Sequence, residues 1–291
     1  MKRSLLVMIL GFSALAGTSQ INVHVGVNSG VNTMLLLDEG INTKPQYVTV
    51  NNINFAPFGV SFGVDFSNKF GIQLETIRAM YDMVYKLKKQ QQEIGELRFQ
   101  LEYIQIPMLL KFMNGSNKQA RLNFAFGPQL SILTAGYETL TLYEQAAGEK
   151  VYIPDSDPNA TDGGILNDLP PGTTNNGDGT YVLPDPINEK VDVELLSTVA
   201  TGQYDEFKNQ ELHIVGGIGL DVDISPKLYI SMFVKGDYGL TDMRNGDLIA
   251  ALEQNTNLQS FTERRATLSL GVQFSIHYMF NGTRFFLKAI N

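Results

Sequence analysis

Residues 265–280, RATLSLGVQFSIHYMF, decide the fold of this chain. Large apolar residues occupy the even positions from Leu268 to Phe280, and small or polar residues occupy the odd positions from Thr267 to His277. Successive side chains of a β-strand point to opposite faces, so this strand has one face suited to lipid and one suited to water. Such a pattern is typical of a transmembrane β-barrel strand.

Seven earlier stretches show the same alternation, and all eight are expected to be strands. We therefore predict an all-β fold, an eight-stranded antiparallel transmembrane β-barrel built as an up-and-down meander. A water-soluble barrel of lipocalin type has the opposite arrangement, with a polar outer face and an apolar interior. The expected strands are residues 21–32, 55–67, 70–85, 97–113, 120–143, 209–225, 228–240 and 264–280.

The connections between these strands alternate between short and long. In outer-membrane barrels the short turns face the periplasm and the long loops face outside. An even number of strands then leaves both termini in the periplasm. The expected turns are 68–69, 114–119 and 225–227, and the expected loops are 33–54, 86–96, 144–208 and 241–263.

The N-terminal residues resemble an export signal. Lys2 and Arg3 precede the apolar stretch 5–15, and small residues follow it. This stretch is shorter than the roughly 20 apolar residues that a membrane-spanning helix needs. We predict a secretory signal peptide at 1–19, a barrel at 20–280 and a C-terminal tail at 281–291. The chain has no cysteine and therefore forms no disulfide.

The fourth expected strand interrupts its alternation after Tyr103, in the segment Ile104-Gln105-Ile106-Pro107. Proline cannot donate a ladder hydrogen bond, and a bulge shifts the alternation by one residue. We therefore predict a β-bulge at this point.

Aromatic residues on the expected outward faces gather toward both ends of the strands. Such girdles mark the two membrane interfaces of a barrel. The turn-side set is Phe66, Phe70, Tyr278 and Phe280, and the loop-side set is Phe58, Phe99 and Tyr238.

The opposite faces of the strands carry charges of both signs. The interior of an eight-stranded barrel is narrow enough for side chains to fill it, so we expect a salt-bridged network that closes the lumen. A small ion path is the alternative, because charged rings can also line pores. The expected lumen-facing charges are Asp65, Glu75, Arg98, Glu102, Asp221, Asp223, Lys235, Asp237 and Arg265.

The loop at 144–208 is strongly acidic. Its thirteen Asp and Glu residues against three Lys give a net charge of −10, compared with −8 for the whole chain. Outside the cell, such a loop could collect divalent cations and bridge them to lipopolysaccharide phosphates. Our default interpretation is a solvated, dispensable loop with a hairpin turn at 176–179.

Part of this loop is similar to the first half of a calcium-binding loop. It lacks the Gly at the sixth position and the Glu at the twelfth that such loops carry, so it is only a weak candidate metal site. The candidate ligands are Asp155, Asp157, Asn159 and Asp162.

Catalytic motifs are not apparent. The three histidines, His24, His213 and His277, lie on different strands, and no serine motif accompanies them. There is no phosphate-binding loop and no basic patch. We predict a non-enzymatic protein without a cofactor or a nucleic-acid partner. An outer-membrane acyl hydrolase remains an alternative.

Several segments together resemble the PorT-like outer-membrane β-barrel proteins typical of Bacteroidota. They are HVGVNSG at 24–30, LEYIQIPMLLK at 101–111, NFAFGP at 123–128 and GGIGL at 216–220. The resemblance covers the strands and ends in the loops. It implies an eight-stranded barrel in the outer membrane and, from at least one member, a role in type IX protein secretion.

From these observations we expect a surface-interaction or assembly component whose partners are outer-membrane lipid, lipopolysaccharide and proteins of the envelope. A narrow porin for ions or small solutes is the main alternative.

Overall fold

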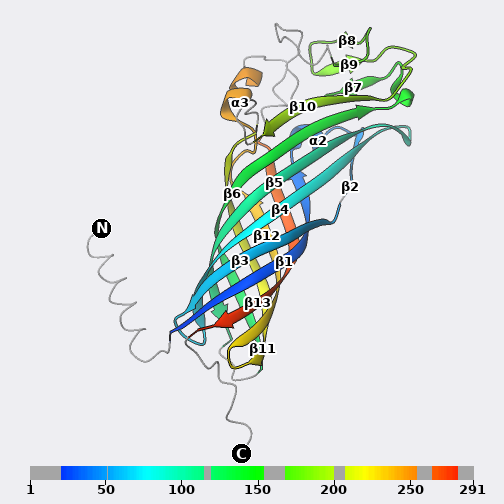
Figure 1. Ribbon diagram of the computed structural model, residues 1–291. Helices are drawn as coiled ribbons and strands as arrows, with labels where there is room; N and C mark the ends of the chain where they lie inside the picture. Colours follow the sequence, from blue (N-terminus) through cyan, green and yellow to red (C-terminus); the bar gives the residue numbers. More distant parts are fainter. Residues whose placement is uncertain are drawn as a thin grey trace, which may run out of the picture.

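Eight long antiparallel strands close into a barrel in the computed structural model of the protein (Figure 1). The structure describes residues 21–50, 52–114, 119–153, 168–199, 207–253 and 264–280. The signal peptide expected at 1–19 and the tail expected at 281–291 lie outside these residues. The barrel strands are β1 (Asn22–Leu37), β3 (Asn54–Asp65), β4 (Phe70–Lys89), β5 (Gln92–Met113), β6 (Ala120–Leu142), β11 (Gln210–Ser225), β12 (Leu228–Gly239) and β13 (Ala266–Met279).

Each barrel strand pairs with the next one along the chain, and β13 pairs back onto β1. The closing ladder runs without a register shift from His24↔Met279 to Leu37↔Ala266. The predicted eight-stranded antiparallel meander is therefore confirmed. Within the described residues, no helix is both long and apolar enough to cross a membrane.

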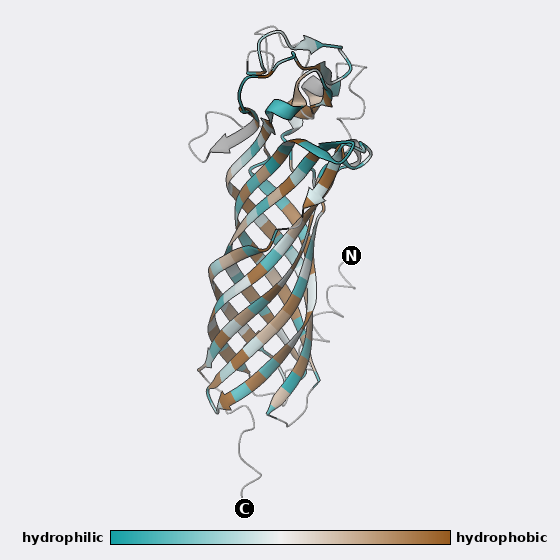
Figure 2. Ribbon diagram, turned by 90° about the vertical axis from the view of Figure 1, so that its right-hand side faces the viewer, coloured by the Kyte–Doolittle hydropathy of each residue, from teal (hydrophilic) through white to brown (hydrophobic). Residues whose placement is uncertain are grey.

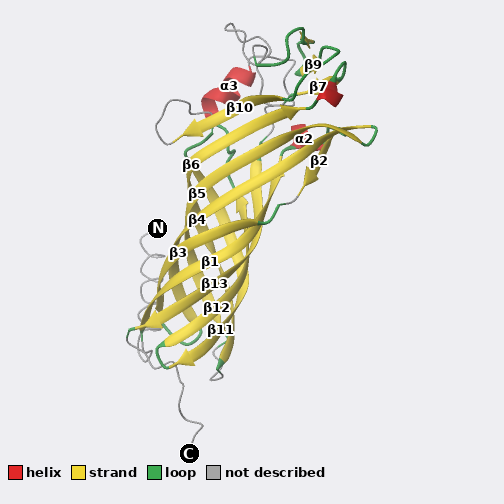
Figure 3. Ribbon diagram, turned by 45° about the vertical axis from the view of Figure 1, so that its right-hand side comes forward, coloured by secondary structure: helices red, strands yellow, loops and turns green. Residues whose placement is uncertain are grey.

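Smaller elements gather at the end of the barrel where the long connections lie (Figures 1 and 3). There β2 pairs with the end of β4, and β10 pairs with the end of β6. A separate three-stranded sheet has the order β7-β9-β8. The bounds are α2 (Glu39–Asn42), β2 (Tyr47–Val50), η1 (Glu144–Ala146), β7 (Lys150–Tyr152), β8 (Thr174–Asn175), β9 (Thr180–Val182), β10 (Val191–Val199) and α3 (Gly246–Glu253).

The prediction of a long loop at 86–96 is wrong, because β4 and β5 continue through these residues. A two-residue turn joins them, with φ of 48° at Gln90 and 74° at Gln91. Two positive φ angles fit a tight hairpin turn whose twist matches the flanking strands. Since neither residue is glycine, asparagine or aspartate, the usual sequence signal for such a turn is missing.

The membrane-facing part of the barrel has the expected polarity. On β13, Phe274 and Ile276 are exposed on the outer face, whereas Gln273 and Ser275 are buried inside. Figure 2 shows this alternation of apolar and polar residues along the strands. The lower barrel therefore presents an apolar surface to lipid and encloses a polar lumen.

The two faces exchange polarity partway up the wall. On β4, the inward side chains change from Gln73 and Glu75 to Ile77, which begins an apolar series. The outward side chains change from Leu74 to the charged Arg78. The strand keeps its odd-inward alternation throughout. Above this polarity exchange the barrel is therefore built like a water-soluble protein, with an apolar core and a polar outer surface.

The bulge predicted in the fourth strand lies on its neighbour instead. From Gly95 to Met113 the alternation along β5 continues without a break, with odd-numbered residues buried. The register shifts where Glu102 pairs with Ala135 and Tyr103 pairs with Leu133, so the extra residue is Thr134 of β6. The apparent break after Tyr103 is the polarity exchange, which from sequence alone looks the same as a shift of alternation.

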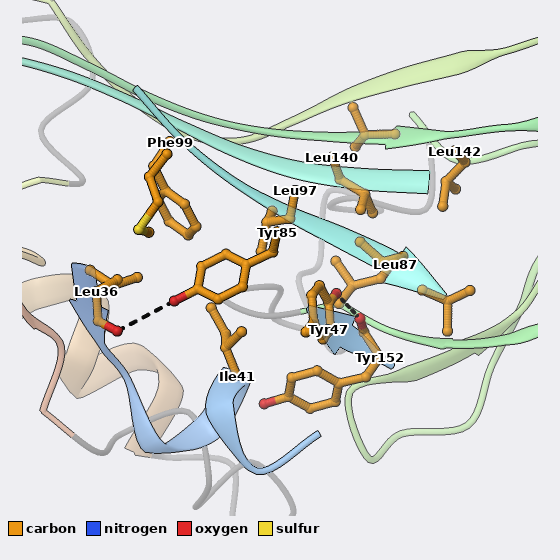
Figure 4. Packing of buried hydrophobic residues seen from close by; sticks show 14 of the residues in the cluster. Leu36, Ile41, Tyr47, Tyr85, Leu87, Leu97, Phe99, Leu140, Leu142 and Tyr152 are labelled. Atoms are coloured by element: carbon orange, nitrogen blue, oxygen red, sulfur yellow. Dashed lines mark hydrogen bonds between the residues drawn. The ribbon is translucent and has the colours of Figure 1, made fainter. Parts of the chain in front are cut away.

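The apolar interior above the exchange continues into the loops. We call this cluster the upper core (Figure 4). Tyr85 of β4 donates a hydrogen bond to the carbonyl of Leu36 on β1, and Tyr47 of β2 donates one to the carbonyl of Tyr152 on β7. Labelled members in Figure 4 are Leu36, Ile41, Tyr47, Tyr85, Leu87, Leu97, Phe99, Leu140, Leu142 and Tyr152.

Substitutions on β13 test which face meets lipid. Phe274→Arg is expected to destabilise the barrel by about 2–4 kcal/mol, because a charge near the bilayer midplane must leave water. Ser275→Thr, on the buried face, should have a mild effect. Urea unfolding in lipid vesicles measures the difference, and equal tolerance at Ser275 and Phe274 would contradict the assignment of faces.

Candidate functional site

The barrel interior below the polarity exchange holds a network of buried ion pairs. Lys111 Nζ lies 2.8 Å from Asp221 Oδ2, and Arg121 Nη2 lies 2.6 Å from Asp223 Oδ1. Asp221 also accepts hydrogen bonds from Asn123 and Ser231, at 2.9 and 2.7 Å. A carboxylate removed from water is stable only when its oxygens have such partners. The first pair links β5 to β11 over the inner face of β6, the strand between them.

Another part of the network is uncharged except for Glu75. Its carboxylate accepts hydrogen bonds from Gln73 at 2.6 Å and from Gln273 at 3.2 Å. Gln273 lies on β13, so these contacts connect β4 with the last strand. They occupy the middle of the bore, where the surrounding cavity measures only about 10 Å³.

Two histidines lie at the end of the barrel that carries the short turns. His24 Nε2 is 3.7 Å from Asp65 Oδ1, and His24 Nδ1 is 3.1 Å from the hydroxyl of Tyr229. The ring of His277 stacks on that of Tyr229, with centroids 4.4 Å apart. Gly63 leaves room for the His24 ring, because a Cβ there would lie 2.2 Å from it. These rings close the lumen at this end.

The third histidine lies higher in the interior. His213 Nδ1 is 3.0 Å from Asp237 Oδ1, and its Nε2 is 3.6 Å from Glu211 Oε2. Tyr103 donates a 2.5 Å hydrogen bond to Glu211, and Ser269 donates one to Asp237. Ser269 and His213 thus bind the same carboxylate rather than each other. A nucleophilic serine and its general base need a direct hydrogen bond, and Ser269 and His213 do not form one with each other.

Arg265 joins the top of the barrel to the upper core. Its guanidinium donates to Asp38 at 2.6 Å and to Glu138 at 2.8 Å, and it lies 5.3 Å from the ring centre of Phe99. The Arg265 side chain is 1% exposed. Burial raises the pKa of Asp38, but Arg265 and the N–H of Ile41 lower it, so that it lies below its usual value.

The prediction that Arg98 and Glu102 face the lumen is wrong. Arg98 forms a two-hydrogen-bond pair with Asp82, at 2.8 and 2.6 Å, on the outer face of the wall. Glu102 forms a 2.6 Å ion pair with Arg78 on the same face. All four side chains are about one third or more exposed. They lie above the polarity exchange, where the outer surface faces water.

The other sequence-predicted charges lie in the interior. Among them, Lys235 Nζ is buried without a hydrogen-bond partner in the described part of the chain. It lines a cavity of about 20 Å³ with Asp237 and Gln105, which is room for a single water molecule. The remaining sequence-predicted charges are all buried, namely Asp65, Glu75, Asp221, Asp223, Asp237 and Arg265.

Two interior cations were missed from the sequence, Lys111 and Arg121. Lys111 shares the odd alternation of Gln105 on β5, and counting through the strand without a bulge would have found it. Arg121 precedes Asn123 by two residues at the start of β6, and the alternation of that strand also points it inward.

The acidic loop is only partly the solvated segment we expected. The candidate calcium ligands Asp155, Asp157, Asn159 and Asp162 lie outside the described residues. The described part contributes Val151, Ile153, Tyr181, Leu183 and Ile187 to the upper core. Within the described ranges, no group of three or more His, Asp and Glu residues is placed to hold a metal ion.

The predicted hairpin turn within this loop is confirmed. It lies between β8 and β9, and Gly177 and Gly179 have φ of 78° and 77°. Asn175 accepts a 2.7 Å hydrogen bond from the N–H of Gly177, and Asp178 accepts a 3.0 Å bond from the N–H of Thr180. These side-chain contacts are those by which Asn and Asp favour turns.

Three solved structures with a similar fold have low sequence identity to this chain. OprG from Pseudomonas aeruginosa is 9% identical, with 90% of this chain and 98% of that chain covered and a TM-score of 0.40. Neisserial surface protein A is 9% identical, with 89% of this chain and 97% of that chain covered and a TM-score of 0.37. Ail of Yersinia pestis is 7% identical, with 90% of this chain and 100% of that chain covered and a TM-score of 0.34. No curated protein matches the chain.

A family model gives a firmer assignment. The model described as "Outer membrane protein beta-barrel domain" matches residues 16–245, which is most of the chain. The match includes the strands from β1 to β12 and the acidic loop between β6 and β11. The closed barrel with its apolar lower surface agrees with this assignment. The chain therefore belongs to the outer membrane protein beta-barrel domain family and is an integral outer-membrane protein.

Proposed function

We propose that this protein is a non-conducting, non-enzymatic barrel that holds a folded extracellular cap for contact with a partner. The observation that carries the proposal is the upper core. Side chains from the barrel wall and from the acidic loop share one apolar cluster, so that the loop is anchored on the barrel rather than set apart from it. A rigid cap of this kind suits recognition of a partner better than passage of solutes through the barrel.

The interior argues against the alternative of a narrow porin. Below the exchange, Lys111 is paired with Asp221 and Arg121 with Asp223, so these charges are bound to each other rather than held in an open ring. Above it, apolar side chains such as Leu97 and Phe99 fill the barrel. An ion crossing this path would have to break buried pairs and then enter an apolar region, and both steps are costly.

The contacts of His213 argue against the second alternative, an acyl hydrolase. Both ring nitrogens of His213 face carboxylates, and the nearby Ser269 is bound to Asp237. All four groups are buried inside the wall, away from lipid substrates.

The partner that we infer for the cap is an envelope component, either lipopolysaccharide or a protein. The resemblance to PorT-like proteins supports a role in assembling the type IX secretion machinery. In this arrangement the short turns and both termini are periplasmic, and the acidic cap is outside. Loss of type IX cargo secretion in a deletion strain, restored by the intact gene, tests that link.

Planar-bilayer recording tests whether the barrel conducts. Purified, refolded protein is expected to insert without stable unitary conductance, whereas a general porin recorded in the same bilayer should give clear steps. Insertion should be verified separately by the change in gel migration on boiling that closed barrels show. Reproducible unitary steps from inserted protein would overturn the proposal in favour of the porin.

A further inference from the structure

The outer wall carries a groove of about 420 Å³ at the level of the polarity exchange. It extends from the start of β3 across β4 and β5 to β6. One side is apolar, and the other carries carboxylates and a tyrosine. The residues that define it are Ile53, Phe55, Met80, Asp82, Glu102 and Tyr137.

The groove exists because β3 and β4 separate. Their ladder begins at Asp65↔Gly71 and ends at Gly59↔Ile77. Beyond that point Pro57 cannot donate a ladder hydrogen bond. The next partner of β4 is β2, which begins to pair at Val50↔Val84. Between these two ladders, Asn54 Oδ1 accepts a hydrogen bond from the N–H of Asp82 at 3.0 Å, which spans the opening.

The far side of the groove is also irregular, because the Thr134 bulge lies beside it. There Ala135 and Tyr137 of β6 border the groove opposite Glu102 and Gln100 of β5. Two breaks in the regular ladder thus flank the same stretch of wall. Bulges and breaks in sheets commonly redirect side chains at binding sites.

The lining changes from apolar to charged across the groove. Ile53 is 83% exposed and Phe55 is 57% exposed, which are high values for large apolar side chains. Both lie at the start of β3, on one side of the groove. The β4 and β5 side carries Asp82 and Glu102, held by Arg98 and Arg78. The groove is therefore amphipathic, with Ile53 and Phe55 on one side and Asp82 and Glu102 on the other.

Arg78 is the cation at the membrane edge of this charged side. Its side chain is 57% exposed, and its Nη2 donates to Glu102. An exposed ion pair of this kind contributes little to stability. A guanidinium has five N–H donors in a planar fork, so Arg78 can bind a phosphate while keeping the contact with Glu102.

We propose that the groove binds one phosphate-bearing lipid of the outer leaflet, of the lipid A class. An acyl chain would lie along Ile53, Phe55 and Met80, and a phosphate would meet Arg78. The occupant follows from the position of the groove, since Phe58 and Phe62 of the lipid-facing surface continue directly from its apolar side. This inference does not depend on the proposed function, because a lipid on the outer wall requires neither a closed lumen nor a partner for the cap.

Native mass spectrometry with added lipid A tests the site on the full-length mature barrel in detergent. The wild type is expected to retain one lipid A molecule. Arg78→Gln and Ile53→Ser should each weaken retention about tenfold, the scale of one lost charge-assisted hydrogen bond or apolar contact. Because Ile53 and Arg78 are exposed, neither change should prevent folding, and heat-modifiable gel migration verifies that the barrel has formed.

Lys86→Gln is the matched control. Lys86 lies on the outer face of the same strand, with a 2.7 Å ion pair to Glu93, but away from the groove. Retention should be unchanged in this variant. Equal loss in the Lys86 and Arg78 variants, or no loss in either groove variant, would overturn the proposal. Displacement of lipid A by millimolar inorganic phosphate would also overturn it, since the site would then bind an anion alone. A barrel that conducts but retains lipid A refutes the proposed function and leaves this site standing.

Discussion

Replacement of Arg265 with alanine is expected to destabilise the protein by about 3–5 kcal/mol, the usual cost of leaving a buried charge without its partner. The guanidinium holds Asp38 from the end of β1 and Glu138 from β6. Without it, two carboxylates would remain in the interior close to one another. The variant should unfold at a markedly lower urea concentration, with the top of the barrel opening first.

Arg98→Ala is the natural control for this prediction. Arg98 forms an ion pair with Asp82 that is as short as those of Arg265, but the side chains are 42% and 32% exposed. Exposed pairs contribute about 0–1 kcal/mol. Urea unfolding of both variants in the same lipid vesicles compares them directly. Similar losses of stability would contradict the assignment of Arg265 to the interior and Arg98 to the outer surface.

Phe99→Ala is expected to have a comparable effect, about 3–5 kcal/mol, because it leaves a cavity in the upper core. Phe99 is fully buried and packs against Tyr85, with ring centroids 6.1 Å apart. It also faces the Arg265 guanidinium, so the two substitutions should not be additive. The measurement is again the free energy of unfolding in urea.

Phe274→Ala is the control with which the effect of Phe99→Ala on the free energy of unfolding is compared. Phe274 is 52% exposed on the lipid-facing side of β13, so its removal leaves a space that lipid can fill. Phe274→Ala should therefore cost much less than Phe99→Ala. The sequence pattern places both residues on the outer face and predicts equal effects. Equal measured losses would show that the upper barrel has no apolar interior.

The lower half of the barrel could be predicted from the sequence because one rule holds there. On β13, Leu270 to Phe280 alternate with polar residues over the full strand, and lipid on one side and water on the other explain the pattern. Asp221 and Asp223 follow the same rule on β11, and both lie in the lumen. For these strands, the alternation alone was sufficient to predict which side chains face the lumen and which face lipid.

The upper half could not be predicted in this way, because the surrounding medium changes along a single strand. Above Ile77 of β4 the outer surface meets water, and the interior becomes apolar. A rule that places polar residues inside then assigns Arg98 and Glu102 to the wrong side. Only three-dimensional structure shows how far a strand extends beyond the membrane, since its local geometry is the same on both sides of the boundary.

The ion pairs in the lumen illustrate a second limit of prediction from the sequence. Alternation on a strand can show that Asp221 points inward, but not that its partner is Lys111, which lies on a strand that is not a neighbour of β11. Such partners depend on the tilt of the strands and the width of the barrel. They could be named from the sequence only as candidates.

The pairing of β1 with β13 also has a consequence for the order of folding. The ladder from His24↔Met279 to Leu37↔Ala266 joins the two ends of the described chain. Contacts so distant in sequence form late, because the chain entropy of closing the ring must be lost before they can contribute. Until β13 arrives, β1 and β12 each have an unpaired edge that can join to another chain. The time between export and arrival of the last strand is therefore when this protein most needs protection from aggregation.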